Sequence, residues 1–255
     1  MSRILGVLLP AIAALLVAGV AAAGDNPAGS PDDWPLPLPD SELRYFVLAE
    51  QLEFRVNDED DLARWEIESW LGGDYNKVWL KTEGEWQTSG SSDGDAEVQL
   101  LYGRTIAPFW DFQMGVRQDV LFGSGPDRER TFAVIGVEGL APYWFELTPA
   151  LFVSDDGDVS FRLEGTYDLL LTQRLVLQPR VEVNAAFQDA RKFGVESGFN
   201  DLELGLRLRY EIRRELAPYI GVNWLKKLGD TADLARDEGG DTSAVGFVVG
   251  LRLWF

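Results

Sequence analysis

The chain has 255 residues, with 42 acidic and 23 basic side chains, a formal charge of −19, and neither histidine nor cysteine. This negative charge argues against nucleic acid as a partner, because phosphate binding needs a basic surface. The two missing residue types exclude disulfides, thiolate metal sites and catalysis by a histidine base.

Residues 1–23 have the pattern of a secretory signal peptide. Arg3 supplies the positive start, residues 4–20 are apolar, and Ala21, Ala22 and Ala23 offer a cleavage site of the A-x-A type. We expect cleavage near Ala23, which removes one positive charge and leaves a mature chain of charge −20. The alternative is an anchoring helix, but no basic stop-transfer cluster follows the apolar run. No later segment approaches about 18 consecutive apolar residues, which excludes helical membrane spans.

Residues 24–42 are rich in proline, glycine, serine and aspartate, and we expect them to form an extended periplasmic lead-in. From Tyr45 onward, apolar residues recur at every second position, which predicts strands with two different faces. We predict twelve strands, at 45–56, 63–72, 76–87, 95–105, 110–121, 130–140, 143–154, 158–170, 174–187, 200–212, 216–227 and 243–255.

The segment 200–212 shows this alternation most clearly, since Leu202, Leu204, Leu206 and Leu208 alternate with charged residues or glycine. The last predicted strand ends the chain and places its apolar side chains on one face. That outward set is Val245, Phe247, Val249, Leu251, Leu253 and Phe255. Twelve such segments of about ten residues predict a closed antiparallel transmembrane β-barrel over residues 43–255, in the bacterial outer membrane. A terminal Phe on the last strand is the usual assembly signal of such barrels.

The predicted connections alternate between short turns and longer acidic or glycine-rich links, with 155–157 as a short exception. Outer-membrane barrels have short periplasmic turns and longer outer loops, so the even strand number predicts periplasmic termini. An Ala-Pro-aromatic repeat at Phe109, Tyr143 and Tyr219 predicts short turns with girdle aromatics at the membrane interface. Pro179 lies inside a predicted strand, where its missing N–H predicts a bulge.

Several segments together resemble the bacterial copper resistance protein B family, in order and over about residues 45–255. They are GGDYNKVWLKTEGE (72–85), LLYGR (100–104), APFWD (107–111), GVEGLAPYWF (136–145), YDLLLTQRL (167–175), LGLRLRYE (204–211) and the terminal WF (254–255).

The resemblance implies an outer-membrane barrel that acts in copper homeostasis, with copper ions and periplasmic copper-resistance proteins as partners besides outer-membrane lipid. Members of the family typically carry a Met- and His-rich segment before the barrel, with ligands that suit copper. This chain has no histidine, and Met114 is the single methionine of the mature part. The family's metal ligands therefore cannot be carried over to any position, and no organic cofactor is expected.

The inward face of the predicted barrel is rich in charge. The candidate metal-binding carboxylates, which could hold a divalent cation through oxygen atoms, are Glu66, Glu68, Glu83, Glu85, Asp111 and Asp119. The alternative is a lumen of Glu–Arg and Glu–Lys pairs that neutralise each other, which is the expected state of buried charges. A carboxylate pair such as Glu83 and Glu85 could do acid–base work, but no catalytic partners accompany it, and we predict that the protein is not an enzyme.

Residues 155–158 (DDGD) look superficially like a calcium loop but lack its closing glutamate, so we expect a solvated turn. The leading hypothesis is a barrel that binds or passes copper ions along luminal carboxylates. The alternative is a structural or general pore-type outer-membrane protein without specific metal binding. A soluble periplasmic barrel of the lipocalin type is a third option.

Overall fold

The computed structural model describes residues 43–57, 61–89, 93–123 and 128–255. The expected signal peptide, the cleavage near Ala23, the lead-in at 24–42 and part of the acidic link after Asn57 lie outside the described residues. Within the described part, no helix is long and apolar enough to cross a lipid bilayer.

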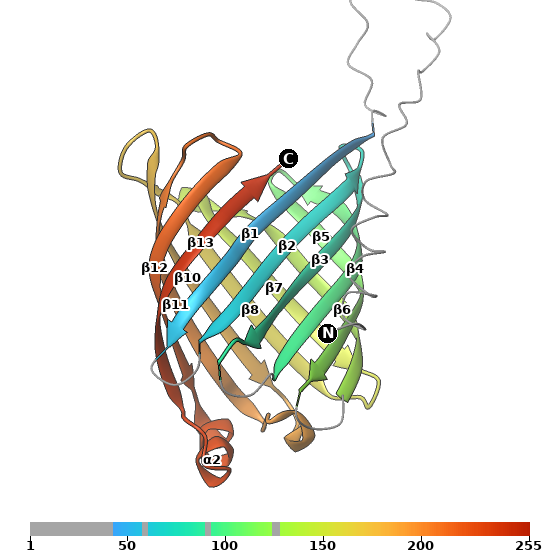
Figure 1. The fold of residues 1–255 in the computed structure, drawn as a ribbon. Coiled ribbons are helices and arrows are strands. Elements are labelled where there is room, and N and C mark those ends of the chain that lie inside the picture. The colour runs from blue at the N-terminus through green and yellow to red at the C-terminus, as the bar shows by residue number, and fades with distance from the viewer. Residues whose placement is uncertain (1–42, 58–60, 90–92, 124–127) are drawn as a thin grey trace, which may run out of the picture. The chain divides into compact units, whose positions relative to one another are not determined.

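The described chain forms a closed antiparallel β-barrel (Figure 1). Its strands are β1 (Arg44–Asn57), β2 (Leu62–Gly72), β3 (Asn76–Gln87), β4 (Gly94–Ala107), β5 (Trp110–Phe122), β6 (Arg128–Ala141), β7 (Phe145–Ser154), β8 (Val159–Tyr167), β9 (Leu169–Leu170), β10 (Leu175–Ala186), β11 (Gly198–Tyr210), β12 (Leu216–Lys227) and β13 (Ser243–Trp254). The short β9 continues β8 beyond Asp168, because both pair with β10 in one register. The wall therefore has the twelve strands that the sequence predicts.

The barrel closes where β13 pairs with β1 (Figure 1). Beyond the last pair of that ladder, Phe255 and Val47 exchange two backbone hydrogen bonds of 2.9 and 3.0 Å. The outward set of the last strand is also confirmed, since Val245, Phe247 and Val249 are at least half exposed. The edges of β1 and β13 thus pair on both sides of a register shift between Ala49 and Glu53, as strands in lipid require.

Alternation places polar side chains inside the barrel and apolar ones outside, and β11 illustrates this. Glu203, Arg207 and Arg209 are buried in the lumen, whereas Leu204 and Leu206 are exposed on the outer wall. An apolar exterior around a charged interior is the arrangement of a barrel that lipid surrounds.

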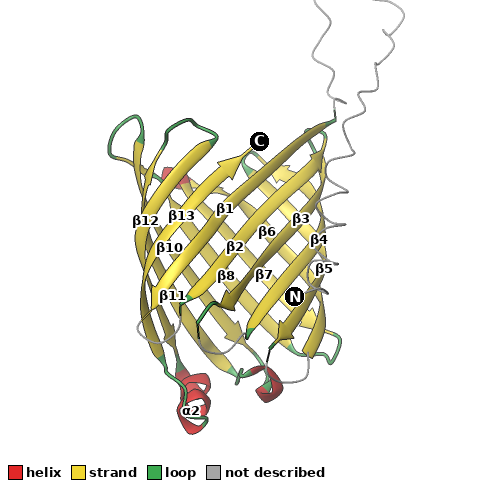
Figure 2. Ribbon diagram, in the orientation of Figure 1, coloured by secondary structure: helices red, strands yellow, loops and turns green. Residues whose placement is uncertain are grey.

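The connections at one end of the barrel are all short, and the two longest connections lie at the other end. The turn end carries the start of β1, the end of β13 and short turns at 73–75, 108–109, 142–144, 171–174 and 211–215. The loop end carries the longer links, among them the helix α2 (Gly229–Asp237) and the 3-10 turn η2 (Arg191–Phe193). Figure 2 shows both helical segments at the end opposite to the C-terminus.

The Ala-Pro-aromatic repeat is confirmed at two of its three positions. Phe109 and Tyr143 lie in short turns at the turn end, are more than two-thirds exposed and have positive φ angles of 68° and 70°. A 3-10 turn, η1 (Pro142–Trp144), therefore delays the start of β7 to Phe145. The third aromatic is a correction, because Tyr219 lies within β12 and is buried in the lumen.

The prediction of a bulge at Pro179 was wrong. The pairing of β10 with β8 ends at Arg180, resumes with β9 at Leu177, and keeps the same register on both sides. The ladder is interrupted opposite Tyr167 and Asp168, because Pro179 cannot donate its backbone hydrogen bond. The missing N–H of Pro179 removes backbone pairing locally, but no extra residue is inserted into the strand.

A bulge does occur in β1. The registers of β1 with β2 and with β13 both shift after Ala49. As a result, the consecutive residues Glu50 and Gln51 both contribute to the lumen, and strict alternation resumes with Glu53 and Arg55. A β-bulge has this effect, since it inserts one residue and re-aims its neighbours.

Candidate functional site

Inside the barrel lies a hydrogen-bonded layer centred on Glu53, whose side chain is fully buried. Arg55 Nε donates to its Oε1 at 2.8 Å, and Arg207 donates to both oxygens at 2.9 Å. The hydroxyl of Tyr219 donates to Oε2 at 3.1 Å. Both guanidinium groups also donate to Gln51 Oε1. These contacts join β1, β11 and β12, which follow one another in the wall with β13 between β12 and β1, so the layer braces this side of the barrel from inside.

Tyr219 reaches Glu53 because Gly250 lies beside it on β13. The two residues form a cross-strand pair, and a Cβ atom at position 250 would overlap the tyrosine ring. Trp79 on β3 lies over Gly103 on β4 in the same way. Glycine is therefore required here by the close approach of an aromatic ring, and not by backbone conformation.

The bulge in β1 supplies a second polar contact nearer the turn end. Arg252 Nε donates to Glu50 Oε2 at 2.6 Å, and Gln178 Nε2 donates to Glu50 Oε1 at 3.0 Å. Arg252 is the single charge that the sequence assigned to the luminal face of the closing strand, and the structure gives it this partner.

Two of the predicted metal-binding carboxylates, Glu66 and Glu68 on β2, face different basic groups. Glu66 lies 3.3 Å from Arg180, and Glu68 lies 3.8 Å from Lys81. Lys81 also donates to Glu138 on β6. The shared strand places both glutamates in the lumen, but it does not bring them onto one partner.

Asp111 and Asp119 lie on the same strand, β5, towards its two ends. Lys77 Nζ donates to Asp111 at 2.5 Å near the turn end. Arg117 forms a two-pronged contact with Asp119 at 2.6 and 2.7 Å towards the loop end. Each aspartate is thus a structural ion-pair partner, as the alternative interpretation of the lumen predicts.

The remaining two candidates, Glu83 and Glu85 on β3, converge on one guanidinium group, that of Arg64 on β2. Arg64 Nη1 lies 3.7 Å from Glu85 Oε2 and 3.8 Å from Glu203 Oε2. Its Nη2 lies 3.8 Å from Glu83 Oε2 and 4.0 Å from Glu182 Oε2. We name Glu83, Glu85, Glu182 and Glu203 the carboxylate quartet.

As they stand, the described residues contain no group of three or more carboxylates arranged to hold a metal ion. The acidic side chains are instead spread over the lumen among lysine and arginine side chains. The sequence therefore placed all six candidates on the correct face of the barrel, but their partners came only with the structure.

Two adjoining cavities lie in the lumen, one towards each end of the barrel. The turn-end cavity has a volume of about 120 Å³ and the loop-end cavity about 460 Å³. Glu83, Glu97, Phe152 and Arg162 line both of them. Arg162 lies between the two glutamates, donating to Glu83 Oε1 and, at 3.1 Å, to Glu97 Oε2. This arginine therefore stands at the boundary between the cavities.

Acidic groups outnumber basic groups in both cavities. The turn-end cavity has only Lys81 and Arg162 as basic lining residues against eight carboxylates: Glu50, Glu66, Glu68, Glu83, Glu97, Glu138, Glu146 and Glu164. The loop-end cavity is lined by nine carboxylates and five arginines: Glu83, Glu85, Asp95, Glu97, Asp119, Asp158, Glu182, Asp201 and Glu203, with Arg55, Arg64, Arg117, Arg130 and Arg162. Such an excess of one charge focuses a field that attracts cations.

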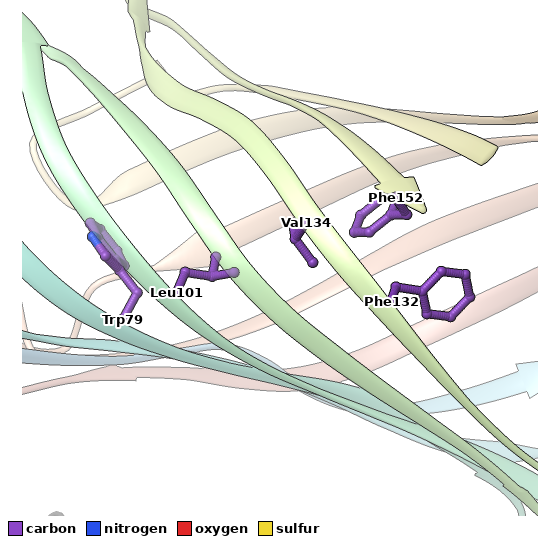
Figure 3. Packing of buried hydrophobic residues seen from close by; sticks show 5 residues of the cluster. All are labelled: Trp79, Leu101, Phe132, Val134 and Phe152. Atoms are coloured by element: carbon purple, nitrogen blue, oxygen red, sulfur yellow. The ribbon is translucent and has the colours of Figure 1, made fainter. Parts of the chain in front are cut away.

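One wall of the lumen is apolar. Trp79, Leu101, Val134, Phe132 and Phe152 form a buried cluster over β3, β4, β6 and β7 (Figure 3). The guanidinium group of Arg117 lies 4.5 Å from the ring centre of Phe152 and 5.0 Å from that of Phe132. Stacking on an aromatic face orients an arginine without neutralising a carboxylate.

At the loop end, the 187–197 connection approaches the lumen through Phe193. Arg130 lies between the rings of Phe132 and Phe193, 4.8 Å from each centre, and donates to Asp158 at 2.6 Å. Residues 155–158 form the tight turn that the sequence predicts, and Asp158 is in addition an ion-pair partner.

The same connection is tied to α2. Asn200 Nδ2 and the Glu196 backbone N–H donate to Thr231 Oγ1 at 2.9 and 3.0 Å. Within the connection, the backbone N–H of Ser197 donates to Asp189 at 2.9 Å and lowers the pKa of that carboxyl group. These contacts hold the two longest loop-end links against each other.

Several luminal residues were missed by sequence reasoning. Arg64 shares the inward phase of Glu66 and Glu68 on β2, so the alternation could have found it. Glu50 and Gln51 could not both be found, because the bulge in β1 leaves no mark in the period-two pattern. Met114 lies on β5 and is exposed on the outer wall. Among the described residues, the luminal metal ligands available are therefore oxygen donors.

Comparison with known proteins gives a consistent result. A family described as Copper resistance protein B precursor (CopB) matches residues 43–255. Copper resistance protein B of Escherichia coli is 48% identical over 216 residues, which cover 85% of this chain and 71% of that protein. A copper resistance protein B homolog of Pseudomonas syringae pv. tomato is 39% identical over the same shares.

Solved structures resemble the chain in fold alone. The NanC porin has a TM-score of 0.50 and 14% sequence identity, with 82% of this chain and 99% of the porin covered. This similarity supports the outer-membrane barrel architecture, and at this identity it carries no information on the transported or bound molecule.

Proposed function

The chain belongs to the copper resistance protein B family, and from this premise we propose that its barrel acts by binding copper ions at luminal carboxylates and passing them between the two cavities. In this proposal the turn end faces the periplasm and the loop end faces the outside, as in other outer-membrane barrels. Periplasmic copper-resistance proteins then meet the barrel at its turn end, and lipid surrounds the outer wall.

The observation that carries the proposal is the charge of the turn-end cavity. Eight carboxylates line it, with Lys81 and Arg162 as the basic lining residues. Arg117, Arg180 and Arg252 pair with Glu97, Glu66, Glu164 and Glu50 from outside the lining, so the uncompensated charge lies where Glu68 and Glu138 share Lys81. Buried carboxylates without counter-charges are costly, so cations or protons stabilise such a cavity. A cavity of about 120 Å³ has room for a hydrated metal ion in place of several waters.

The donor set favours copper(II) over copper(I). Copper(I) prefers thiolate and thioether ligands, whereas copper(II) also accepts carboxylate and carbonyl oxygens. Met114 points outward, so the described lumen offers no thioether. Oxygen ligation is less selective than imidazole or thioether ligation, which predicts that other divalent ions compete.

The rival function, a general pore, is disfavoured by the layer around Glu53. Glu53, Arg55 and Arg207 are all buried there and bonded to one another. An open diffusion pore needs a wide continuous aqueous path, and in this proposal the bonded side chains on this side of the lumen narrow it. In planar bilayers we expect the refolded barrel to show rare and small conductance steps, and a steady unselective conductance would favour the rival function.

The proposal is tested by growth of a deletion strain that expresses the protein or its variants. Loss of the protein should lower copper tolerance, and the variant E68Q/E138Q/E146Q should restore it less well than the native chain. The matched control is E215Q in the turn before β12, at the same end of the barrel but away from the turn-end cavity. Equal copper tolerance of the native and deletion strains would contradict the proposed role.

Copper-resistance relatives and a porin-like fold point to a protein that is not an enzyme.

Calorimetric titration of the refolded barrel with copper(II) measures the binding step directly. Binding by the native chain that is weakened in E68Q/E138Q/E146Q would support luminal carboxylates as ligands. Absence of copper(II) binding would remove the proposed mechanism, even if copper tolerance depends on the protein.

A further inference from the structure

Arg64 is held differently from the other luminal arginines. Its four carboxylate neighbours all lie at 3.7 to 4.0 Å, which is longer than a hydrogen bond. Its Nε atom is buried and has no hydrogen-bond partner among the described residues. Arg207, in contrast, donates to Glu53 through two nitrogens at 2.9 Å. Arg64 therefore balances charge at the centre of the quartet without being fixed there.

Three members of the carboxylate quartet have one oxygen that accepts a hydrogen bond and a second oxygen within ion-pair distance of Arg64. Glu83 Oε1 accepts from Arg162, Glu182 Oε1 accepts from Asn184 at 3.0 Å, and Glu203 Oε1 accepts from Arg55 at 3.1 Å. Their Oε2 atoms form the long contacts with Arg64. These oxygens come from opposite walls of the barrel, so they surround Arg64 instead of lying on one side of it.

Two buried oxygens beside the quartet lack a hydrogen bond in the part of the chain that the structure describes. One is Glu182 Oε2, which belongs to the quartet and makes its shortest ion-pair contact with Arg180 at 2.9 Å. The other is Oδ1 of Asn223 on β12, a residue that is 5% exposed and lines the same cavity. A neutral carbonyl oxygen buried without a donor is costly, and a cation would satisfy it.

The quartet is reached from the loop-end cavity. Arg64, all four glutamates and Asn223 line that cavity of about 460 Å³. Its lining carries a formal excess of four negative charges, given nine carboxylates and five arginines. Glu83 also lines the turn-end cavity, so an ion on the quartet stands at the passage between the two.

We propose that the carboxylate quartet is a divalent-cation site that Arg64 occupies as a tethered counter-ion, and that Arg64 moves aside when a divalent cation enters from the loop-end cavity. This inference rests on the proposed function and names its substrate class, a divalent cation taken on oxygen ligands. When no metal is present, Arg64 thereby compensates part of the negative charge of the quartet. It also sets the affinity, since an entering ion must replace a charge that is already there.

The decisive experiment compares R64Q with the native barrel, both refolded in detergent, by calorimetric titration with copper(II) sulfate. Removal of the competing charge should raise the affinity for copper(II) at least about tenfold. The matched control is R130Q, which deletes one arginine charge from the same cavity but leaves the quartet intact. R130Q should change the affinity much less than R64Q does.

Two further measurements keep the inference testable if R64Q refolds poorly. The variant E182Q/E203Q, which keeps Arg64, should bind copper(II) more weakly than the native barrel, because it lacks two quartet ligands. The thermal midpoint of R64Q should be lower than that of the native chain in EDTA and should rise on adding copper(II), since a ligand that binds only the folded state stabilises it. Electron paramagnetic resonance of bound copper(II) should show oxygen ligation without nitrogen hyperfine structure.

Equal effects of R64Q and R130Q would overturn the inference, because the change would then reflect cavity charge alone. Unchanged copper(II) binding in E182Q/E203Q would also overturn it. The proposed function fails separately: a deletion strain with native copper tolerance, together with tight copper(II) binding by R64Q, would leave the quartet as a cation site and remove its role in copper resistance.

Discussion

The backbone of Phe255 exchanges two hydrogen bonds with the backbone of Val47, at 2.9 and 3.0 Å. The last residue of the chain is thus a paired part of the barrel wall. Removing it would leave the polar backbone groups of Val47 without partners in a region where lipid cannot replace them. The backbone of Phe255 therefore contributes to the closure of the barrel.

Deletion of Phe255 should destabilise the refolded barrel more than the substitution F255A. The substitution keeps both backbone bonds and loses only the ring, whereas deletion loses all of them. With a net value of roughly 1 kcal/mol per hydrogen bond, the difference in unfolding free energy should be about 2 kcal/mol. Urea titration followed by heat modifiability on gels measures it. Equal stability of the two variants would show that the ring alone matters.

The substitution E53Q should lower the free energy of unfolding by roughly 3–5 kcal/mol, because it leaves Arg55 and Arg207 buried without their main counter-charge. The exposed Asp156 in the loop-end turn provides the comparison, and D156N should stay within about 0.5 kcal/mol of the native chain. Chemical unfolding in detergent gives both values. A mild effect of E53Q would mean that water replaces the lost ion pairs.

The substitution G250A should destabilise the barrel by roughly 1–3 kcal/mol, since the new methyl group would overlap the ring of Tyr219 in a packed interior. In the Y219A background, where the ring is gone, the same substitution should have little effect. G240A serves as the control, because its Cβ would make an ordinary contact of 3.5 Å with a backbone oxygen. Additive effects of G250A and Y219A would contradict the proposed overlap.

Opening the layer around Glu53 should convert the barrel into a conducting pore. The triple variant Q51S/R55S/R207S shortens three side chains of this layer. Single-channel recording should then show stable conductance steps that the native barrel lacks. R191S/R236S removes two arginines from the loop-end connections, both more than half exposed, and should leave the native record unchanged. If the triple variant conducts no better than the native barrel, other residues obstruct the lumen.

Much of this fold was predictable because lipid requires each strand to alternate apolar outward side chains with polar inward ones. The alternation of leucine with charged residues at 202–208 predicted β11 and its two faces correctly. The outward set of the final strand and the alternating connection lengths were predicted correctly for the same reason. The face of the strand on which a residue lies follows from its place in the period-two alternation, and that alternation can be read from the local sequence.

Partners across the lumen were not predictable, because they depend on barrel closure and on register. Nothing near Glu85 in the sequence indicates that Arg64 on the neighbouring strand and Glu203 on a distant strand approach it. The β1 bulge also leaves no mark in the pattern, so Glu50 falls on the outward phase when one counts back from Glu53 and Arg55. Tyr219 misled for another reason, since an Ala-Pro-Tyr triplet fits a strand start as well as a turn.

The outer wall has a consequence for the time before the barrel is complete. Val222 and Phe247 are cross-strand neighbours on that wall, as are Ile220 and Val249, and all four side chains are largely exposed in the finished fold. Lipid covers these side chains only after insertion. Before insertion they therefore form a broad apolar surface that is exposed to water. The charged lumen cannot hide them, because it forms only when the wall closes. Until lipid covers this surface, the chain is therefore at risk of aggregation.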